Sequence, residues 1–397
     1  MAGALLTLNA GSSSIKFAIF QVEGSGDPQA VARGKIEGIG TAPHLIARAA
    51  NGAVLTEKRW EDGADLSHEA FLGDLLDWVD THVDGDRLIG VGNRVVHGGR
   101  DFFAPVAIDD TVLDRLDALC PLAPLHQPHS LHAIRAVRAA RPSLRQVACF
   151  DTAFHHEQPA VATRFALPRA LEEEGVRRYG FHGLSYEYVA GRLAELDPPL
   201  AAGRVIAAHL GNGASLCAMH GGRSIDTTMG FTALDGLMMG TRCGTIDPGV
   251  IFYLMRQHGL SADAVEHLLY DRSGLLGVSG VSSDMRALLD SDDPRSAEAI
   301  DLFTYRIARE SGALVASLGG VDGVVFTAGI GENATEVRAR VCARLGWLGV
   351  VLDEQANERG EPVISTPESR VTVRVIPTDE EAMIAIHARD VVGSAAR

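Results

Sequence analysis

Two segments of the 397-residue chain, at residues 5–20 and 204–227, follow the same order of apolar and turn-forming residues. Each segment begins with an apolar run, passes through a short stretch rich in Gly, Asn and Ser, and continues with a second apolar run. In the first segment, LLTLNAGSSSIKFAIF, the residues at 15, 17 and 19 are apolar, and a period of two is typical of a β-strand. The chain therefore contains one supersecondary plan twice, which predicts two α/β domains that each open with a β-meander.

The turn NAGSSS in the first segment raises the question of a phosphate-binding loop. A Walker-type loop requires G-x-x-x-x-G-K-[ST] between a strand and a helix, and this segment has neither the second glycine before Lys16 nor a helix after it. We expect a β-hairpin tip instead. Two such tips facing each other across a cleft would grip a polyphosphate, with the amide oxygen of Asn9 near a magnesium ion and the ammonium of Lys16 near phosphate oxygens. The alternative is two tight Gly-Ser turns that bind no ligand.

Charge and composition exclude several classes of protein. The 36 basic and 51 acidic side chains give a formal charge of −15, which argues against binding nucleic acid or an anionic membrane through a generally basic surface. The five cysteines are odd in number and show no C-x-x-C spacing, so we expect reduced thiols and no zinc site. No basic segment precedes the first apolar run, and no stretch reaches the roughly 18 apolar residues of a spanning helix. We expect a soluble, cytoplasmic protein.

Hydrophobic periodicity places the other elements that frame a site. Strands are expected at residues 88–96, at 146–150 ending at Asp151, at 324–327 and at 371–377. Helices are expected around residues 71–79, at 131–141 before Pro142, at 295–318, and from Thr378 onward. A carboxylate at the end of a strand, such as Asp151, is well placed for a cleft. The strand at 324–327 runs into a glycine turn and a helix, an arrangement that suits an anion or a nucleotide.

Three cationic or titratable side chains lie in glycine-rich surroundings: Arg94 in NRVVHGG, His182 in YGFHGLS and Arg242 in GTRCGTIDPG. A guanidinium is a natural bidentate partner of a carboxylate or a phosphoryl group, although a single arginine is more often a surface or ion-pair residue. From its position alone, Asp151 is either a general base or a hydrogen-bonded residue that ends a strand.

Other histidines offer weaker signals. We expect no zinc site at His126, His129 and His132, because Pro128 would interrupt the helix needed to align them, and we expect His155 and His156 at a polar surface.

Taken together, these motifs resemble the acetate kinase family, short-chain carboxylate kinases of the acetate and sugar kinase, chaperone ATPase and actin superfamily. NAGSSSIKF, RVVHGG, FDTAFH, YGFHG, AHLGNGAS, DTTMGFTALDGLMMGTR, FTAGIGEN and IPTDEEA occur in the family's order and span almost the whole chain. The resemblance implies an α/β fold of two ribonuclease-H-like domains, the duplicated actin-like ATPase fold, around a nucleotide cleft. It implies an N-terminal domain of residues 1–150 with a returning helix at 381–397, and a nucleotide-binding domain of residues 151–380.

The activity implied by the resemblance is acetate kinase, the reversible Mg²⁺-ATP-dependent phosphorylation of acetate to acetyl phosphate by direct in-line transfer. Magnesium, for which Mn²⁺ would substitute, is held by Asn9 and Glu380. Asp151, His182 and Arg242 are catalytic, with Asp151 either acting as a base or holding other groups in place. The nucleotide-binding set consists of Lys16, His209, Leu210, Gly211, Asn212, Gly213, Asp284, Met285, Arg286, Gly329, Ile330, Gly331, Glu332 and Asn333. Arg94 orients the substrate carboxylate, and the acyl pocket is walled by Val96, Leu125, Phe181 and Ala233. By the same resemblance the protein forms a homodimer.

Ala233 is the departure that bears most on substrate choice, because the family pattern has a proline there. One methylene in an apolar pocket is worth about 1–3 kcal/mol, so a propionate or other short-chain carboxylate kinase of the same family is the first alternative. A second alternative is an actin-like or chaperone-like nucleotide-binding protein, which would not require Arg94, His182 and Arg242. The remaining departures from the family pattern are Asn93 for His, Gln127 for Asn, Cys243 for Ser, Thr245 for Asp and Asp379 for Asn.

Overall fold

The computed structural model describes residues 2–11, 14–24, 26–60, 68–82 and 88–394 of the chain. The fold divides into two compact units, of which the first combines residues 1–153 with 379–397 and the second comprises residues 154–378. Asp151 and Glu380 both belong to the first unit. Ser12 and Ser13, which we expected to shape the first turn, lie outside the described residues.

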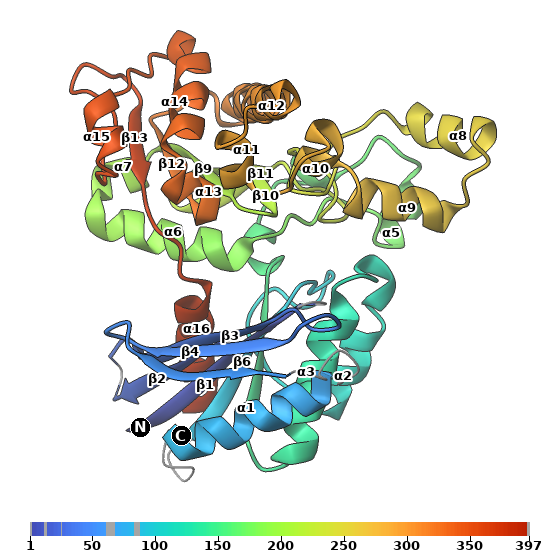
Figure 1. The fold of residues 1–397 in the computed structure, drawn as a ribbon, viewed down its shortest axis with the longest axis vertical. Coiled ribbons are helices and arrows are strands. Elements are labelled where there is room, and N and C mark those ends of the chain that lie inside the picture. The colour runs from blue at the N-terminus through green and yellow to red at the C-terminus, as the bar shows by residue number, and fades with distance from the viewer. Residues whose placement is uncertain (1, 12–13, 25, 61–67, 83–87, 395–397) are drawn as a thin grey trace. The chain divides into compact units, whose positions relative to one another are not determined.

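The described part of the first unit contains an eight-stranded sheet with the order β5-β4-β3-β2-β1-β6-β8-β7 (Figure 1). Its strands are β1 (Ala2–Ala10), β2 (Ser14–Glu23), β3 (Gln29–Glu37), β4 (His44–Ala49), β5 (Val54–Arg59), β6 (Leu88–Val95), β7 (Val106–Ala107) and β8 (Gln146–Phe150). The strands β1 to β5 form an antiparallel meander, and β1 is paired in parallel with β6, which is paired in parallel with β8. The hairpin and the meander predicted at the N-terminus are confirmed.

Helices cover both faces of the first sheet. The helices of this unit are α1 (His68–His82), α2 (Asp110–Asp117), α3 (Gln127–Ala140) and α16 (Glu380–Ser394), with a 3₁₀ turn at Cys120–Leu122. Successive residues of β2 point to opposite faces, as the pleat requires. Phe17 packs in the core that includes α1 and α3, whereas Ala18 and Phe20 pack against Ala385 of α16. The C-terminal helix therefore completes the core of the N-terminal unit.

The second unit repeats this plan in a five-stranded sheet with the order β11-β10-β9-β12-β13. Its strands are β9 (Arg204–Leu210), β10 (Ala214–His220), β11 (Arg223–Thr227), β12 (Gly323–Thr327) and β13 (Thr372–Val375). The first three strands are antiparallel, and β12 is parallel to β9 and to β13. The order β3-β2-β1-β6 of the first unit corresponds to β11-β10-β9-β12 of the second, so the predicted duplicated α/β fold is confirmed.

The helices of the second unit are mostly short, apart from α6 and α12, which lie on opposite sides of the sheet (Figure 1). They are α4 (Ala160–Thr163), α5 (Arg169–Glu173), α6 (Gly183–Leu196), α7 (Pro198–Ala201), α8 (Pro248–Gln257), α9 (Ala262–Asp271), α10 (Gly274–Ser279), α11 (Met285–Leu289), α12 (Pro294–Leu318), α13 (Ala328–Asn333), α14 (Thr335–Arg344) and α15 (Glu354–Glu358), with 3₁₀ turns at Ala153–His155 and Gly346–Leu348. The side chain of Asp293 caps the start of α12, and Gly319 ends it in a left-handed conformation.

Two expectations about histidines change. Pro128 lies in the first turn of α3, where its missing N–H costs no hydrogen bond, so it begins the helix rather than interrupting it. No group of metal-ligating side chains is found among the described residues. The expected surface position of His155 is wrong, because this side chain is buried between Ser224 and the carbonyl of Phe181. The five cysteines are free thiols. No described helix is long and apolar enough to cross a membrane.

Candidate active site

In the first unit, Asn9, Arg94 and Asp151 meet at one edge of the sheet. They lie at or just beyond the carboxyl ends of β1, β6 and β8, which are parallel and therefore end at the same edge. The Nε atom of Arg94 donates to Oδ1 and Oδ2 of Asp151 at 3.0 and 3.1 Å, and its Nη2 atom also donates to Oδ2. The Nη1 atom of Arg94 donates to Oδ1 of Asn9 at 3.1 Å. Three side chains predicted as site residues thus form one hydrogen-bonded cluster.

The charges around Arg94 are predominantly negative. Burial opposes the charged form of the guanidinium, but the carboxylates of Asp151 and Glu380 outweigh it and raise the pKa of Arg94 above its ordinary value. Burial, followed by the charge of Glu380, raises the pKa of Glu381. Arg94, whose side chain is 22% exposed, therefore lies among carboxylate and amide oxygens, and one of these carboxylates, Glu381, also lies 3.8 Å from Arg33. Oxygen donors of this kind suit a hard divalent cation such as Mg²⁺.

Glu381 was not among the predicted site residues. The signal that would have revealed it is the pair of adjacent glutamates in IPTDEEA, at the start of the last helix.

Lys16 lies directly opposite Asn9 in the pairing of β1 with β2, and its side chain is exposed. Of the two acyl-wall candidates in this unit, Val96 is buried, but the side chain of Leu125 is 41% exposed.

In the second unit, the turn at Gly211, Asn212 and Gly213 joins β9 to β10. The Gly211 N–H donates to the carbonyl of Gly213 at 2.9 Å, and the Gly240 N–H donates to the carbonyl of Asn212 at 3.0 Å. A Cβ atom added to Gly213 would lie 3.1 Å from both Nη2 of Arg242 and Nε2 of His182. Glycine at this position therefore allows the turn, Arg242 and His182 to approach one another.

His182 is held in place by contacts around its ring. It has a left-handed backbone conformation, with φ of 59°, immediately before α6. Its Nδ1 atom lies 2.8 Å from Oγ of Ser215, which is also 2.6 Å from the hydroxyl of Tyr186. The ring stacks on His209 with a centroid separation of 4.2 Å, and Nδ1 of His209 lies 2.8 Å from Oγ of Ser185. These contacts leave Nε2 of His182 at the glycine turn.

Arg242 is fixed by a loop that contains three of the departures from the family pattern, Ala233, Cys243 and Thr245. Its Nη1 atom donates to the carbonyl of Ala233 at 2.7 Å, so this residue of the expected acyl wall also orients the guanidinium. The Thr245 hydroxyl donates to Oδ1 of Asp235 at 2.8 Å. Burial raises the pKa of the Cys243 thiol, which favours its neutral form. Phe181, the other wall candidate of this unit, is buried.

Two of the departures in the first unit, Asn93 and Gln127, are buried and hydrogen-bonded. Gln127 accepts from the N–H of His97 at 3.1 Å and donates to its carbonyl at 3.0 Å. Asn93 donates to the side chain of Gln146 at 3.2 Å. Both residues therefore support the strand ends of the first unit from within the core.

A pocket of about 550 Å³ in the second unit brings together many of the predicted nucleotide contacts. Its walls are formed by Gly211, Asn212, Ser283, Asp284, Met285, Arg286, Leu289, Gly329, Ile330, Asn333 and Ala334. Ser283, Leu289 and Ala334 had not been predicted, although each adjoins a predicted segment. Because segments around residues 211, 284 and 330 converge on one cavity, the volume and mixed lining suit a small organic ligand.

Besides Gly213, four predicted nucleotide residues of this unit do not line the pocket. Leu210 and Gly331 are buried, and His209 stacks on His182. The Glu332 carboxylate accepts hydrogen bonds from the backbone N–H groups of Ala328 and Thr378 at 2.8 and 3.0 Å. Glu332 thus ties α13 to the segment that leads out of the unit.

Arg338 is a supporting residue that the sequence analysis missed. Its buried guanidinium donates to the carbonyls of Gly331 and Glu332 at 3.0 and 2.7 Å, and to the side chain of Asn357 at 2.7 Å. The sequence feature that could have indicated its burial is its position on α14 beside Val337, Val341 and Cys342, all of which are buried. An arginine on an apolar helix face requires buried acceptors, which here are the last carbonyls of α13.

Comparisons with known proteins agree with this geometry. Residues 4–386 match the model of the acetokinase family. An acetate kinase of Rhodopseudomonas palustris strain TIE-1 is 55% identical over 393 residues, which cover 98% of each chain. Among solved structures, the acetate kinase of Porphyromonas gingivalis is 39% identical with a TM-score of 0.87, over 98% of this chain and 100% of that one. A propionate kinase from Francisella tularensis is 36% identical with a TM-score of 0.91, over the same shares.

Proposed function

Because the chain belongs to the acetokinase family, and its activity is the reversible phosphorylation of acetate with ATP and ADP as co-substrates, we propose roles for its two clusters in that reaction. The observation that carries the proposal is the convergence of Arg242, His182 and the glycine turn at Gly213. The nucleotide lies in the 550 Å³ pocket, with its adenosine against Asp284, Met285, Arg286 and the segment 329–333. Its phosphates extend along the turn at 211–213, and Lys16 also binds them.

Arg242 and His182 stabilise the phosphoryl group during transfer. Charge spreads over the equatorial oxygens of that group in the transition state, and preorganised cationic or hydrogen-bonding groups stabilise it most. Both side chains are already oriented, Arg242 by the carbonyl of Ala233 and His182 by Ser215. The acceptor carboxylate is a nucleophile at neutral pH, so in-line transfer requires no general base.

Arg94 orients the acetate carboxylate, and Asp151 orients Arg94. The bidentate contact between them leaves the Asp151 carboxylate 1% exposed, which supports a positioning role rather than that of a base. Of the two roles considered for Asp151, base or positioning group, we therefore propose the second, in which Asp151 is needed for catalysis but moves no proton.

We further propose that Asn9 and Glu380 hold Mg²⁺, for which Mn²⁺ would substitute. The carboxylate and amide oxygens gathered around Arg94 support this site. When bound, the cation neutralises phosphate charge and fixes the phosphate geometry. Asn9→Ala is expected to raise the Mg²⁺ concentration that gives half-maximal activity, and an unchanged Mg²⁺ dependence would contradict the contact.

Acetate is the proposed preferred acceptor, and propionate is the second candidate because Ala233 replaces a bulkier proline. The test is to compare kcat/KM for acetate, propionate and butyrate under one set of conditions. A kcat/KM for acetate above those for the other two acids supports the proposal, and a kcat/KM for propionate tenfold above that for acetate would contradict it. Ala233→Pro is the matched variant, since a smaller pocket should lower kcat/KM for propionate more than kcat/KM for acetate.

We further propose that the protein is a homodimer in the cytoplasm. Helix α8 has no buried side chain, and its apolar residues Val250, Phe252, Tyr253 and Met255 are 38–57% exposed. Such a face is typical of an association surface, and we assign it to a second copy of this chain. Sedimentation should give a dimer for the native protein and a monomer for Phe252→Asp with Tyr253→Asp. A native monomer would contradict the assignment.

A further inference from the structure

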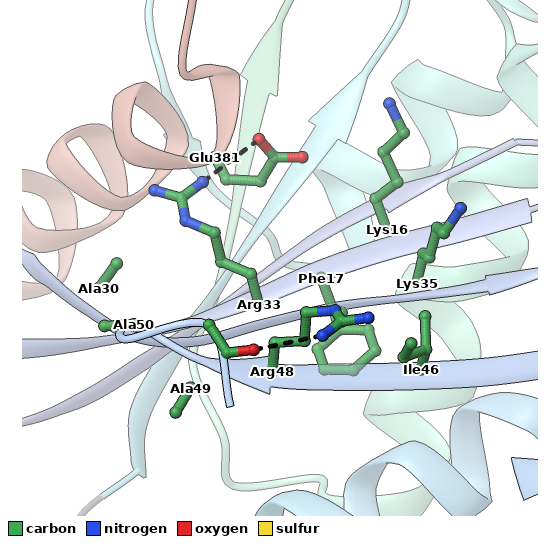
Figure 2. A pocket seen from close by; sticks show the side chains of 12 residues that line it. Lys16, Phe17, Ala30, Arg33, Lys35, Ile46, Arg48, Ala49, Ala50 and Glu381 are labelled. Atoms are coloured by element: carbon green, nitrogen blue, oxygen red, sulfur yellow. Dashed lines mark hydrogen bonds and ion pairs between the residues drawn. The ribbon is translucent and has the colours of Figure 1, made fainter. Parts of the chain in front are cut away.

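A second cavity, of about 490 Å³, lies in the first unit over β2, β3 and β4, next to the start of α16 (Figure 2). Four cationic side chains line it, Lys16, Arg33, Lys35 and Arg48, together with the carboxylate of Glu381. Figure 2 shows Lys16, Arg33 and Lys35 on the side of the sheet from which Glu381 approaches. The rest of the lining is small or apolar, as at Gly34, Ala49 and Ile46. We call this cavity the cationic groove.

The strand register places like charges next to one another. Lys16 of β2 lies directly opposite Lys35 of β3, and Arg33 of β3 lies directly opposite Arg48 of β4. Neighbouring strands are about 5 Å apart and residues two apart on one strand are about 7 Å apart, so the four positions form a compact block. Like charges directly opposite each other on one face destabilise a sheet. The chain therefore maintains an arrangement that opposes its own folding.

Carboxylates compensate this block only in part, because Glu37, Asp379 and Glu381 face four cationic side chains and the charge of Lys16 also acts on Glu381. Arg33 is paired with Asp379 and lies 3.8 Å from Glu381, and Lys35 lies 2.5 Å from Glu37. Within the part of the chain that the structure describes, neither Lys16 nor Arg48 forms an ion pair, and Arg48 donates to the carbonyl of Gly52 at 3.2 Å. In a chain with a formal charge of −15, this is a local excess of positive charge. An anion of matching size would remove the repulsion.

We propose that the cationic groove binds a small polyanion whose anionic groups lie about 5–7 Å apart, the spacing of the block. Phosphoryl and carboxylate groups share the required chemistry, since both accept hydrogen bonds from guanidinium and ammonium donors. The occupant also contacts Lys16. Given the proposed role of Lys16 at the ATP phosphates, occupancy of the groove weakens the binding of ATP and so regulates the kinase.

Calorimetric titration tests the site without catalysis. Inorganic tripolyphosphate and propane-1,2,3-tricarboxylate are titrated separately into the full chain at low salt, with no nucleotide, acetate or Mg²⁺. At least one probe should bind with a stoichiometry of one, and Lys35→Gln with Arg48→Gln should weaken it at least tenfold. Both side chains are exposed and lie outside the proposed catalytic groups, so activity without the probe should not change. The matched control is Arg59→Gln on β5, which does not line the groove.

The outcomes separate the groove from the ATP site. Failure of both probes to bind, or affinities equal in the wild type and the double variant, would overturn the proposal. Equal affinities together with displacement by ADP would place the probe at the nucleotide pocket instead. In activity assays at constant free Mg²⁺, the probe should raise KM for ATP in the wild type and not in the double variant. Binding with no change in that KM would refute the coupling through Lys16. The titration contains no substrate, so an error in the assigned reaction cannot affect it.

Discussion

Arg94, Asp151 and Arg242 are all charged side chains fixed by the fold, but they differ in what remains available to a substrate. Arg94 directs Nε and Nη2 to Asp151 and Nη1 to Asn9. Arg242 uses one terminal nitrogen on the carbonyl of Ala233, and its other terminal nitrogen lies at the glycine turn. Catalysis of phosphoryl transfer depends on positioned charge. The arrangement of Arg242, which is oriented and keeps one terminal nitrogen at the glycine turn, is therefore the one suited to stabilising a transition state.

Arg242→Ala should lower kcat by about 10³-fold while leaving the KM for ATP within a few-fold of wild type, because the lost charge acts on the transition state. The measurement is steady-state kinetics in the direction of acetyl phosphate formation. Thermal unfolding of the variant serves as the control for folding. A kcat within a few-fold of wild type would show that the role is misassigned.

His155 gives the fold a dependence on pH. Nε2 must donate to the carbonyl of Phe181, so Nδ1 accepts from the hydroxyl of Ser224, and the buried ring is neutral. Burial lowers the pKa of His155 to about 4. Because this folded pKa lies below the unfolded value near 6.5, stability is lost as pH falls from about 6.5 to about 4. The pKa of His97, also lowered by burial to about 4, adds a loss of the same sign.

His155→Gln should be less stable than wild type at pH 7 but should lose less stability between pH 6.5 and 4, by about 3 kcal/mol at most. Denaturant unfolding at several pH values measures this difference. The control is His258→Gln at an exposed position, which should keep the wild-type slope. A slope unchanged by His155→Gln would contradict the assignment.

At the scale of elements, the sequence predicted the strands and helices better than the residues that connect them. The period of two after Asn9 predicted β2, and the apolar run at 324–327 before glycines predicted β12 and α13, because local pattern reflects which face is buried. The burial of His155 could not be predicted because its partner Ser224 lies 69 residues further along the chain. That of Arg338 could not be predicted because its acceptors are Asn357, 19 residues further along, and carbonyls that are free to accept only because α13 ends at Asn333. The candidate nucleotide segments converge because of strand order, and strand order is not a local property.

One departure from the family pattern stabilises the start of α16. Asp379 receives Nη1 of Arg33 at 2.9 Å and pairs with its second terminal nitrogen, and it also accepts from the N–H of Ala382 at 2.9 Å. With a carboxylate at this position, the contact between β3 and the helix becomes an ion pair. The next two residues, Glu380 and Glu381, are thereby held near Arg94.

Asp379→Ala should therefore lower the free energy of unfolding by about 1–2 kcal/mol, as for loss of a helix cap, and should raise the Mg²⁺ concentration for half-maximal activity. Denaturant unfolding and Mg²⁺ titration measure the two effects. The matched control is Asp293→Ala, which removes the cap of α12 and its pair with Arg295 in the second unit. That variant should lose stability without a change in the Mg²⁺ requirement. Equal Mg²⁺ behaviour of both variants would contradict a positioning role for Asp379.

At the scale of the whole molecule, the first unit is built from two separate stretches of chain. Residues 1–153 supply the sheet and the helices of one face, and residues 379–397 supply α16 on the other. The apolar residues of β2 that face α16, Ala18 and Phe20, have no other helix in their packing cluster among the described residues. The first unit is therefore complete only after the second has been synthesised.

A chain that ends at Thr378 should for this reason keep the second unit folded and lose the first. Without α16, Ala18 and Phe20 become exposed, and Arg94 loses the carboxylates of Glu380 and Glu381. Limited proteolysis should cut preferentially within residues 1–153, whereas residues 154–378 should stay protected and become more so with ADP. The control ends at Ser394 and retains all of α16, so its cleavage should match that of the full chain. Protection of residues 1–153 in the shorter chain would show that the sheet is stable without its C-terminal helix.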